Sequence, residues 1–167
     1  MLERRSALAA AKPYRSDVLQ MGEIRGFTLL QVSGLSRDFE AKFMAITGDS
    51  KTRTILRIAP SQFWIIAPQT DDLAAQLQGL CAVTPLSHSR SRIFLEGAPA
   101  RDVLAKGIAL DFHESAFTPG RLAMTGLHHT PVLVHCISET RFELYVMRTF
   151  AMSIWDWLSD AAQEFAA

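Results

Sequence analysis

Polar and hydrophobic side chains alternate along the segment that begins at His88, and this alternation predicts a β-strand. His88, Arg90 and Arg92 occupy every second position, so they would lie on one side of the strand. Ile93 and Leu95 would face the other side and enter a hydrophobic core. The segment therefore predicts a half-buried strand with one basic face.

The residues after this strand predict a short helix with defined ends. Pro99 suits the first helical position, because its fixed φ matches a helix and its missing N–H would have no partner there. Val103 and Leu104 supply an apolar face. Lys106 and Gly107 suit the last turn and the C-terminal cap. The pattern therefore places a helix directly after the strand.

Further hydrophobic runs, separated by Gly, Pro and polar residues, predict the remaining strands. Residues 63–66 are apolar in succession, which predicts a strand buried on both faces, either in the middle of a sheet or under a partner. Pro119 and Gly120 suit the centre of a type II turn. The expected strands cover residues 27–33, 54–58, 63–67, 81–86, 121–125, 132–137 and 142–146.

A period of three to four apolar positions predicts three more helices. Ser36 and Thr70 are the expected N-terminal caps of the first two, because a side-chain oxygen at that position can accept from a free helix N–H. Gly48 is expected to end the first helix. The inward positions are Phe39, Phe43 and Ile46 in the first helix, Leu73, Leu77 and Leu80 in the second, and Ala151, Ile154, Leu158, Ala161 and Phe165 in the last.

The order of these elements predicts an α+β fold. The first half has the order β-α-β-β-α-β of a split β-α-β (ferredoxin-like) arrangement, and the second half echoes it before a C-terminal helix. We therefore expect one domain over residues 26–167, with halves at about 26–86 and 87–167. Residues 1–25 lack sustained periodicity and are expected to form an extended arm that lies against another surface, such as another subunit.

The composition limits the class of partner. The 167 residues include 17 Lys and Arg and 17 Asp and Glu, and a formal net charge of +0 provides no long-range field to attract nucleic acid. Hydrophobic residues make up 49% of the sequence, which suggests that another chain covers some apolar surface. Cys81 and Cys136 lie in apolar runs and are expected to be reduced core thiols.

Membrane insertion and secretion are not expected. No segment approaches the roughly 20 apolar residues that span a bilayer. Arg4 and Arg5 precede a short apolar run, but Lys12 and Pro13 interrupt it before the length of a signal sequence. We therefore expect a cytoplasmic protein.

The residues that could carry chemistry do not form a recognisable site. The sequence has no H-x-x-x-H or C-x-x-C pairing for a metal, no G-x-S-x-G nucleophile elbow and no glycine-rich phosphate loop. His128 and His129 suit a polar turn. The other histidines are His88, His113 and His135, and the scattered carboxylates, expected in solvated or capping roles, are Asp17, Glu23, Asp111, Glu114 and Glu143.

Six residues are candidates for contact with a partner. Guanidinium groups suit bidentate contacts with carboxylate or phosphate, although an exposed strand face with weak ion pairs is the favoured explanation of the basic stripe. Tryptophan suits either a core or an interface. The candidate partner-contact residues are His88, Arg90, Arg92, Arg148, Trp155 and Trp157.

Several segments taken together resemble one known family. They are LSHSR at 86–90, APARDVLAKG at 98–107, FELYV at 142–146 and SIWDWL at 153–158. They resemble the gamma subunit family of heterotetrameric sarcosine oxidase, and the resemblance extends over most of the chain from about Arg5. It implies a fold related to the folate-binding domain of the glycine cleavage aminomethyltransferase.

The resemblance also implies a role inside a larger complex. In such complexes the beta subunit holds FAD and the amine site, the alpha subunit binds NAD and carries a folate-binding domain, FMN lies between alpha and beta, and the delta subunit binds zinc. Oxidative demethylation of sarcosine gives glycine, peroxide and a one-carbon unit that tetrahydrofolate captures. The resemblance assigns no catalytic, cofactor-binding or metal residue to this chain, and so implies a non-catalytic assembly subunit.

Two other functions fit the same residues. One is a free-standing folate-binding or aminomethyltransferase-like protein, although such proteins are longer and their pterin-binding acidic residues have no matching position here. The other is the equivalent subunit of an oxidase for a different N-methyl amine, because the choice of substrate would reside in the beta subunit.

Overall fold

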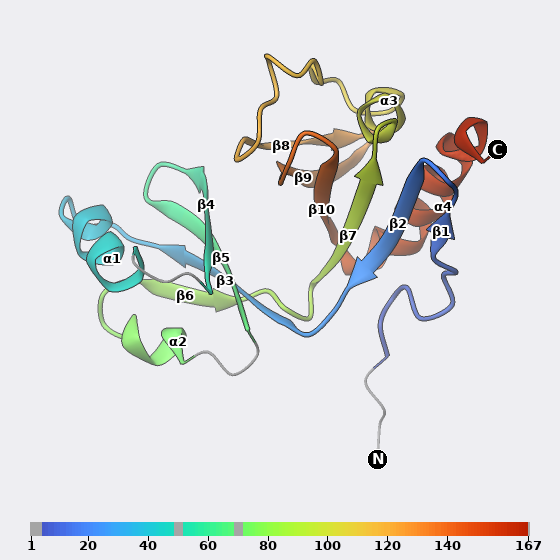
Figure 1. Ribbon diagram of the computed structural model, residues 1–167. Helices are drawn as coiled ribbons and strands as arrows, with labels where there is room; N and C mark the ends of the chain where they lie inside the picture. The colour runs from blue at the N-terminus through green and yellow to red at the C-terminus, as the bar shows by residue number, and fades with distance from the viewer. Residues whose placement is uncertain (1–4, 49–51, 69–71, 167) are drawn as a thin grey trace. The chain divides into compact units, whose positions relative to one another are not determined.

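The computed structural model describes residues 5–48, 52–68 and 72–166 (Figure 1). The chain divides into two compact units: unit 1 comprises Met1–Ile24 and Ser89–Ala167, and unit 2 comprises Arg25–His88. Unit 1 contains β1 (Tyr14–Arg15), β2 (Leu19–Ile24), β7 (Arg90–Gly97), α3 (Ala100–Ala105), β8 (Leu122–Leu127), β9 (Thr130–Cys136), β10 (Arg141–Met147), η1 (Arg148–Phe150), α4 (Ala151–Ala161) and η2 (Gln163–Phe165). Unit 2 contains β3 (Phe27–Ser33), α1 (Phe39–Thr47), β4 (Thr54–Ala59), β5 (Gln62–Pro68), α2 (Leu73–Gln76) and β6 (Ala82–Pro85).

Unit 2 is built on a four-stranded antiparallel sheet in the order β4-β5-β3-β6. β5 lies between β4 and β3, and its residues Phe63 to Ala67 are all buried, which confirms the expected internal strand. The helices α1 and α2 cover one face, where the Phe43 and Phe63 rings stack at a centroid distance of 4.7 Å. A small aromatic core therefore holds this unit together.

The first helix of unit 2 ends at Gly48 as expected, but its N-terminal cap and one of its inward positions differ from the expectation. α1 begins at Phe39 after Asp38, and Ser36 is not a side-chain cap; its carbonyl instead accepts from the Phe39 N–H at 3.1 Å. At the other end Ile46 is 39% exposed, whereas Thr47 is 1% exposed. The Thr47 hydroxyl donates to the Phe43 carbonyl at 2.8 Å, so burial leaves it satisfied.

The second helix of unit 2 is shorter than expected. α2 is a single turn, Leu73–Gln76, and Gly79 with φ +81° redirects the chain soon after it. Leu77 is nevertheless buried, so the expected inward positions still contribute to the core. The expected cap Thr70 lies outside the described residues.

Unit 1 is built on a six-stranded antiparallel sheet in the order β1-β2-β7-β10-β9-β8 (Figure 1). α3 and α4 share a hydrophobic core with one face of this sheet. On β7 that face carries Ser91, Ile93 and Leu95, which are buried, while Arg90 and Arg92 point to the opposite face. The predicted alternation along β7 is therefore confirmed.

Part of the expected N-terminal arm lies inside this sheet. β2 pairs with β7 from Leu19 opposite Gly97 to Ile24 opposite Arg92. A Cβ at Gly22 would lie 2.5 Å from Cε1 of Phe94, so the position needs glycine for close packing. In the sequence Gly22 suggested a loop, but the residue lies in β2, between β1 and β7 in the sheet.

Two predicted turns are confirmed. The Arg121 N–H donates to the Thr118 carbonyl at 3.0 Å and Gly120 has φ +85°, as a type II turn requires. His128 and His129 form the two-residue connection between β8 and β9.

Both cysteines are free thiols. Within the described ranges no helix has the length and apolarity to cross a membrane.

Candidate functional site

The central strands of unit 1 bring together charged and polar side chains on the sheet face opposite α3 and α4. Tyr145 of β10 lies opposite Arg92 of β7, and Glu143 of β10 lies opposite His135 of β9. Residues two apart on one strand share a face, so β10 places Glu143 beside Tyr145. We call Arg92, His135, Glu143 and Tyr145 the β7–β10–β9 cluster.

Glu143 is the centre of this cluster. Its side chain is buried, at 3% exposure for the residue, and one carboxylate oxygen, Oε2, accepts two hydrogen bonds and makes a further ion-pair contact. Arg92 donates from Nε at 2.9 Å, and the Tyr145 hydroxyl donates at 3.0 Å. The Nη2 atom of Arg92 lies 2.7 Å from the same oxygen as an ion pair. A buried carboxylate needs such partners, because removing it from water is costly.

The surroundings shift the pKa values of two cluster members. Burial, together with the neighbouring Glu143 carboxylate, raises the pKa of Tyr145, while Arg92 acts in the opposite direction. Burial also lowers the pKa of His135, and of the two nearby charges Glu143 opposes this shift and Arg92 adds to it. At neutral pH Tyr145 is therefore a protonated hydrogen-bond donor and His135 is a neutral imidazole.

A second ion pair extends the cluster toward β2. Arg141 of β10 contacts Glu96 of β7 at 2.5 Å, and the amide of Gln20 in β2 donates to the same carboxylate at 3.4 Å. The Arg141 guanidinium also lies over the Phe94 ring, 4.8 Å from its centroid. Polar contacts therefore cross three adjacent strands and fix their register.

The arrangement supports structure more directly than catalysis. Arg92 and Arg141 are already paired with the carboxylates of Glu143 and Glu96. The Tyr145 hydroxyl keeps its proton and donates it in a hydrogen bond to Glu143. Across the residues with assigned positions, no three His, Cys, Asp or Glu side chains gather as a metal site. The expectation that Glu143 is solvated or capping was wrong, because the register of β7 and β10, which the sequence does not show, places it against Arg92.

Three of the four basic candidate residues are at least partly accessible, and the fourth, Arg92, is largely internal. The Arg92 side chain is 16% exposed and held by Glu143. Arg90 is partly buried and donates to the Ser89 carbonyl at 3.2 Å, and burial lowers its pKa. His88 is exposed in the turn that precedes β7, within unit 2. Arg148 is exposed, and its guanidinium donates to the Arg5 carbonyl.

The two tryptophans of α4 have different surroundings. Trp155 is buried in the core of unit 1. Trp157 is partly buried, and its ring meets His128 edge-on at a centroid distance of 5.3 Å. A Cβ at Gly107 would lie 2.5 Å from Trp157 Cζ2, so glycine is needed there for packing against the ring. Trp157 thus connects α4 to the end of α3 and to the β8–β9 turn.

Arg101 of α3 is a further organising residue, which the sequence did not single out for this purpose. Its Nε donates to the Glu139 carbonyl at 3.0 Å, and Nη1 donates to the carbonyls of Phe112 and Phe117 at 2.6 and 3.1 Å. The guanidinium also stacks over Phe142, 5.1 Å from the ring centroid. One side chain therefore connects α3 to the loop before β8 and to the β9–β10 turn.

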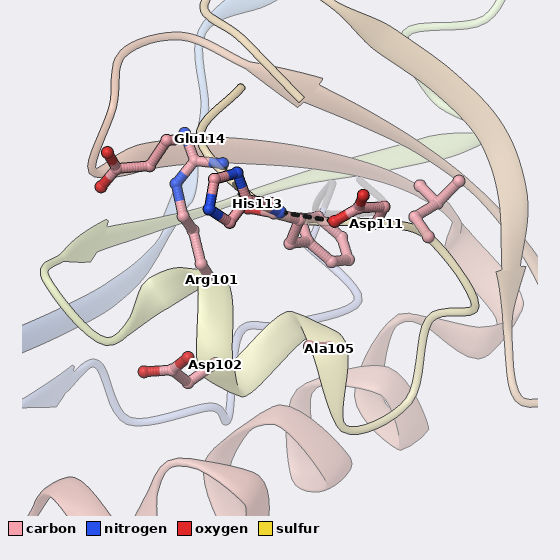
Figure 2. Close-up of a pocket in the computed structure, with 8 residues that line it drawn as sticks. Arg101, Asp102, Ala105, Asp111, His113 and Glu114 are labelled. Carbon is pink, nitrogen blue, oxygen red and sulfur yellow. Dashed lines mark hydrogen bonds between the residues drawn. The ribbon is translucent and has the colours of Figure 1, made fainter. Parts of the chain in front are cut away.

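This loop borders an open pocket of about 660 Å³. Figure 2 shows Arg101 extending from α3 toward His113 and Glu114, while Asp102 points away from them. Asp111 accepts from the His113 N–H at 2.9 Å, which confirms a capping role for this carboxylate (Figure 2). The pocket lining includes Asp111, Glu114 and Arg101, whose Nε and Nη1 already donate to carbonyl groups.

The family of the chain follows from its sequence match. Residues 43–164 match the sarcosine oxidase, gamma subunit family. The chain belongs to this family. It is 32% identical over 127 residues to the sarcosine oxidase subunit gamma of Corynebacterium sp. (strain U-96), covering 73% of this chain and 62% of the relative. The match to the corresponding Arthrobacter sp. subunit is also 32% over 127 residues and covers 73% and 63%. The matched region thus spans less than two thirds of these relatives.

Solved structures agree with the family at the level of the fold. The chain is similar to one chain of the heterotetrameric sarcosine oxidase from Corynebacterium sp. U-96, with a TM-score of 0.87, 28% identity and coverage of 98% of this chain and 97% of that one. The aminomethyltransferase T of the glycine cleavage system from Bartonella henselae matches with a TM-score of 0.58, 17% identity and coverage of 86% and 46%. The expected α+β fold and its likeness to the aminomethyltransferase fold are confirmed.

Proposed function

We propose that this gamma subunit family member is a non-catalytic subunit that supports assembly of a heterotetrameric sarcosine oxidase. Its partners in this proposal are the alpha, beta and delta subunits, and the complex works in the cytoplasm. The observation that carries the proposal is the match of 98% of the chain to one chain of such a heterotetramer. A likeness over nearly the whole length of both chains favours the same place in the same kind of complex.

The chemistry of the proposed complex resides in the other subunits. In this proposal the other subunits hold the cofactors, which are FAD, FMN, NAD, tetrahydrofolate and zinc. The proposal assigns none of them to residues of this chain. The complex oxidatively demethylates sarcosine to glycine, produces peroxide and passes the one-carbon unit to tetrahydrofolate. The β7–β10–β9 cluster supports a structural role for this subunit, since Glu143 is already occupied by Arg92 and Tyr145.

The first experiment is capture of the chain from its native cells under gentle salt. We expect the eluate to contain three further subunits, to show flavin absorption and to produce peroxide when sarcosine is added. A colourless chain alone that binds tetrahydrofolate would overturn the proposal and favour the free-standing folate-binding protein. Activity with a different N-methyl amine but not with sarcosine would overturn the assignment of substrate.

A second experiment separates assembly from catalysis. The alpha, beta and delta subunits are co-expressed with and without this chain, and the yield and flavin content of the resulting complex are measured. We expect both to fall without the chain, because a missing subunit exposes the surfaces it normally covers. Normal yield, flavin content and folate coupling without it would contradict an assembly role.

The exposed candidate Arg148 provides a residue-level test. We expect Arg148→Ala to retain less of the other subunits on an affinity column than the wild-type chain. Arg37→Ala is the matched control, because Arg37 is also an exposed arginine but is not among the candidate contact residues. Equal retention of the other subunits by both variants would remove Arg148 from the proposed interface.

A further inference from the structure

The four outer strands of the two sheets differ in how their free edges are protected. An exposed edge tends to pair with other chains, and proteins prevent this with short strands, charges, prolines or bulges. β1 has two residues and includes Arg15, β4 carries Arg57 and a register shift between Arg57 and Ala59, and β6 has four residues and ends in Pro85. β8 has none of these features: its six residues, Leu122–Leu127, are uncharged, contain no proline and pair with β9 without a shift.

The register shows which backbone groups of β8 face outward. The Cys136 N–H donates to the Arg121 carbonyl at 2.9 Å, and the Cys136 carbonyl accepts from the Gly120 N–H at 2.8 Å, so the Arg121 carbonyl faces β9. Hydrogen-bonded and non-hydrogen-bonded pairs alternate along an antiparallel ladder, so Leu122 and Met124 direct their N–H and C=O groups away from β9. Within the ranges that the structure describes, no segment hydrogen-bonds to these two residues on that side.

One end of the edge is closed by the chain itself. Ile108 forms a bridge with Leu127, and the His128 N–H donates to the Gly107 carbonyl at 3.3 Å. The open part is therefore residues 122–125. Within it Met124 is 51% exposed, the highest value among the large hydrophobic side chains described for unit 1. An unpaired backbone edge and an exposed apolar side chain thus occur together.

Charge at the open end indicates the chemistry of the occupant. Arg121 is exposed immediately before β8, and no ion pair to it occurs among the described residues. We propose that the outer edge of β8 receives an extended segment of another subunit, uncharged beside residues 122–125 and with a carboxylate next to Arg121. The added strand would extend the six-stranded sheet by main-chain hydrogen bonds. This inference rests on the proposed function, because it needs another subunit.

A different subunit suits this edge better than a second copy of the chain. Pairing between two copies over four residues would bury far less than the roughly 1,200 Å² of a stable interface. A segment from a subunit that already contacts this chain elsewhere needs no such area. Two copies would also bring two positively charged Arg121 side chains into the same interface.

Hydrogen–deuterium exchange provides the primary test. The isolated full chain is compared with the purified complex, and the peptide that contains Leu122 and Met124 is followed. We expect these two amides to exchange about tenfold more slowly, or slower still, in the complex. The edge strand β4 is the control within the same chain, and its exchange should not change. Unchanged exchange of the β8 peptide in an intact complex would overturn the inference and leave the proposed function standing.

A pair of variants tests the backbone contribution. Met124→Pro removes an outward N–H without removing a ladder bond to β9, whereas Met124→Thr keeps that N–H and shortens the side chain. We expect Met124→Pro to lower retention of the other subunits by about tenfold and Met124→Thr to lower it much less. Equal loss in both variants would contradict strand addition. If Met124→Pro does not fold, the exchange measurement on the wild-type complex decides.

The remaining outcomes distinguish the occupants. Arg121→Glu should weaken retention of the other subunits if a carboxylate lies next to Arg121, and unchanged retention would remove that part of the proposal. Protection of the β8 amides in a dimer of the isolated chain, measured by sedimentation and exchange, would replace the other subunit with a second copy. If no other subunit co-purifies at all, the proposed function fails and this inference fails with it.

Discussion

The guanidinium of Arg92 meets one carboxylate oxygen of Glu143 with two nitrogens: Nε donates a hydrogen bond at 2.9 Å, and Nη2 lies 2.7 Å away as an ion pair. The two residues come from adjacent strands and are 51 positions apart in the sequence. Both side chains are largely removed from solvent, at 16% and 4% exposure. The contact therefore differs from a surface ion pair, whose contribution to stability is small.

Removal of one partner of this ion pair should strongly destabilise unit 1. We expect Glu143→Ala to lower the free energy of unfolding by about 3–5 kcal/mol, because Arg92 is left as a buried charge. The double variant Arg92→Met with Glu143→Leu should recover much of this loss. Urea unfolding measures both. Lys42→Ala, which removes an exposed pair with Asp38, is the control and should change stability little.

Tyr145→Phe tests the hydroxyl that donates to Glu143. We expect a loss of about 1–2 kcal/mol in the free energy of unfolding at neutral pH, because one hydrogen bond to a buried carboxylate disappears. The folded state raises the pKa of Tyr145, so above the unfolded-state value of about 10 only the unfolded chain loses the proton. The stabilising contribution is therefore complete below about pH 10 and decreases above it.

Unfolding measured from pH 8 to pH 11 checks this dependence. The advantage of the wild-type chain over Tyr145→Phe should shrink above about pH 10. A constant difference over the whole range would mean that the pKa of Tyr145 is not raised by folding.

His135 should make the chain sensitive to mild acid. Burial lowers its pKa, and its Nδ1 has no hydrogen-bond partner in the structure as described. Below about pH 6.5 the imidazole of His135 binds a proton in the unfolded chain but stays neutral in the folded chain. The free energy of unfolding therefore falls as the pH decreases. His135→Leu should reduce the decline in unfolding free energy between pH 7.5 and pH 5.5. His129→Gln, at an exposed turn, should leave the decline unchanged.

Arg101→Met should loosen the loop before β8. Three backbone carbonyls, those of Phe112, Phe117 and Glu139, lose a charged donor, and we expect a cost of about 2 kcal/mol or more. Hydrogen exchange in residues 110–118 should increase, while the β5 peptide remains protected. Arg121→Met is the control, because this arginine is exposed. Equal effects of the two variants on the loop would contradict the role of Arg101.

The sequence predicted those elements whose signals are local. The alternation along β7, the turn at Gly120 and the buried β5 each depend on side chains a few positions apart, and all three are confirmed. The family could also be recognised from short segments, and the match over residues 43–164 confirms it.

The rest depends on pairing between distant segments, which local patterns do not encode. β2 looked like part of a loose arm because Gly22 interrupts it, and the reason for that glycine is the ring of Phe94 on the neighbouring strand. Glu143 looked solvated because its partner Arg92 is set by the β7–β10 register. Ser36 looked like a cap, but the helix starts three residues later, at Phe39.

Unit 1 is assembled from two separate stretches of chain, with the whole of unit 2 between them in the sequence. β2 leaves the ribosome early but cannot pair with β7 until synthesis has passed Gly97. Unit 2 is continuous and is complete once His88 has emerged. The β7-facing edge of β2 therefore remains unpaired during translation while a later-made unit is completed. This period is when a chaperone or another subunit would have the most to protect.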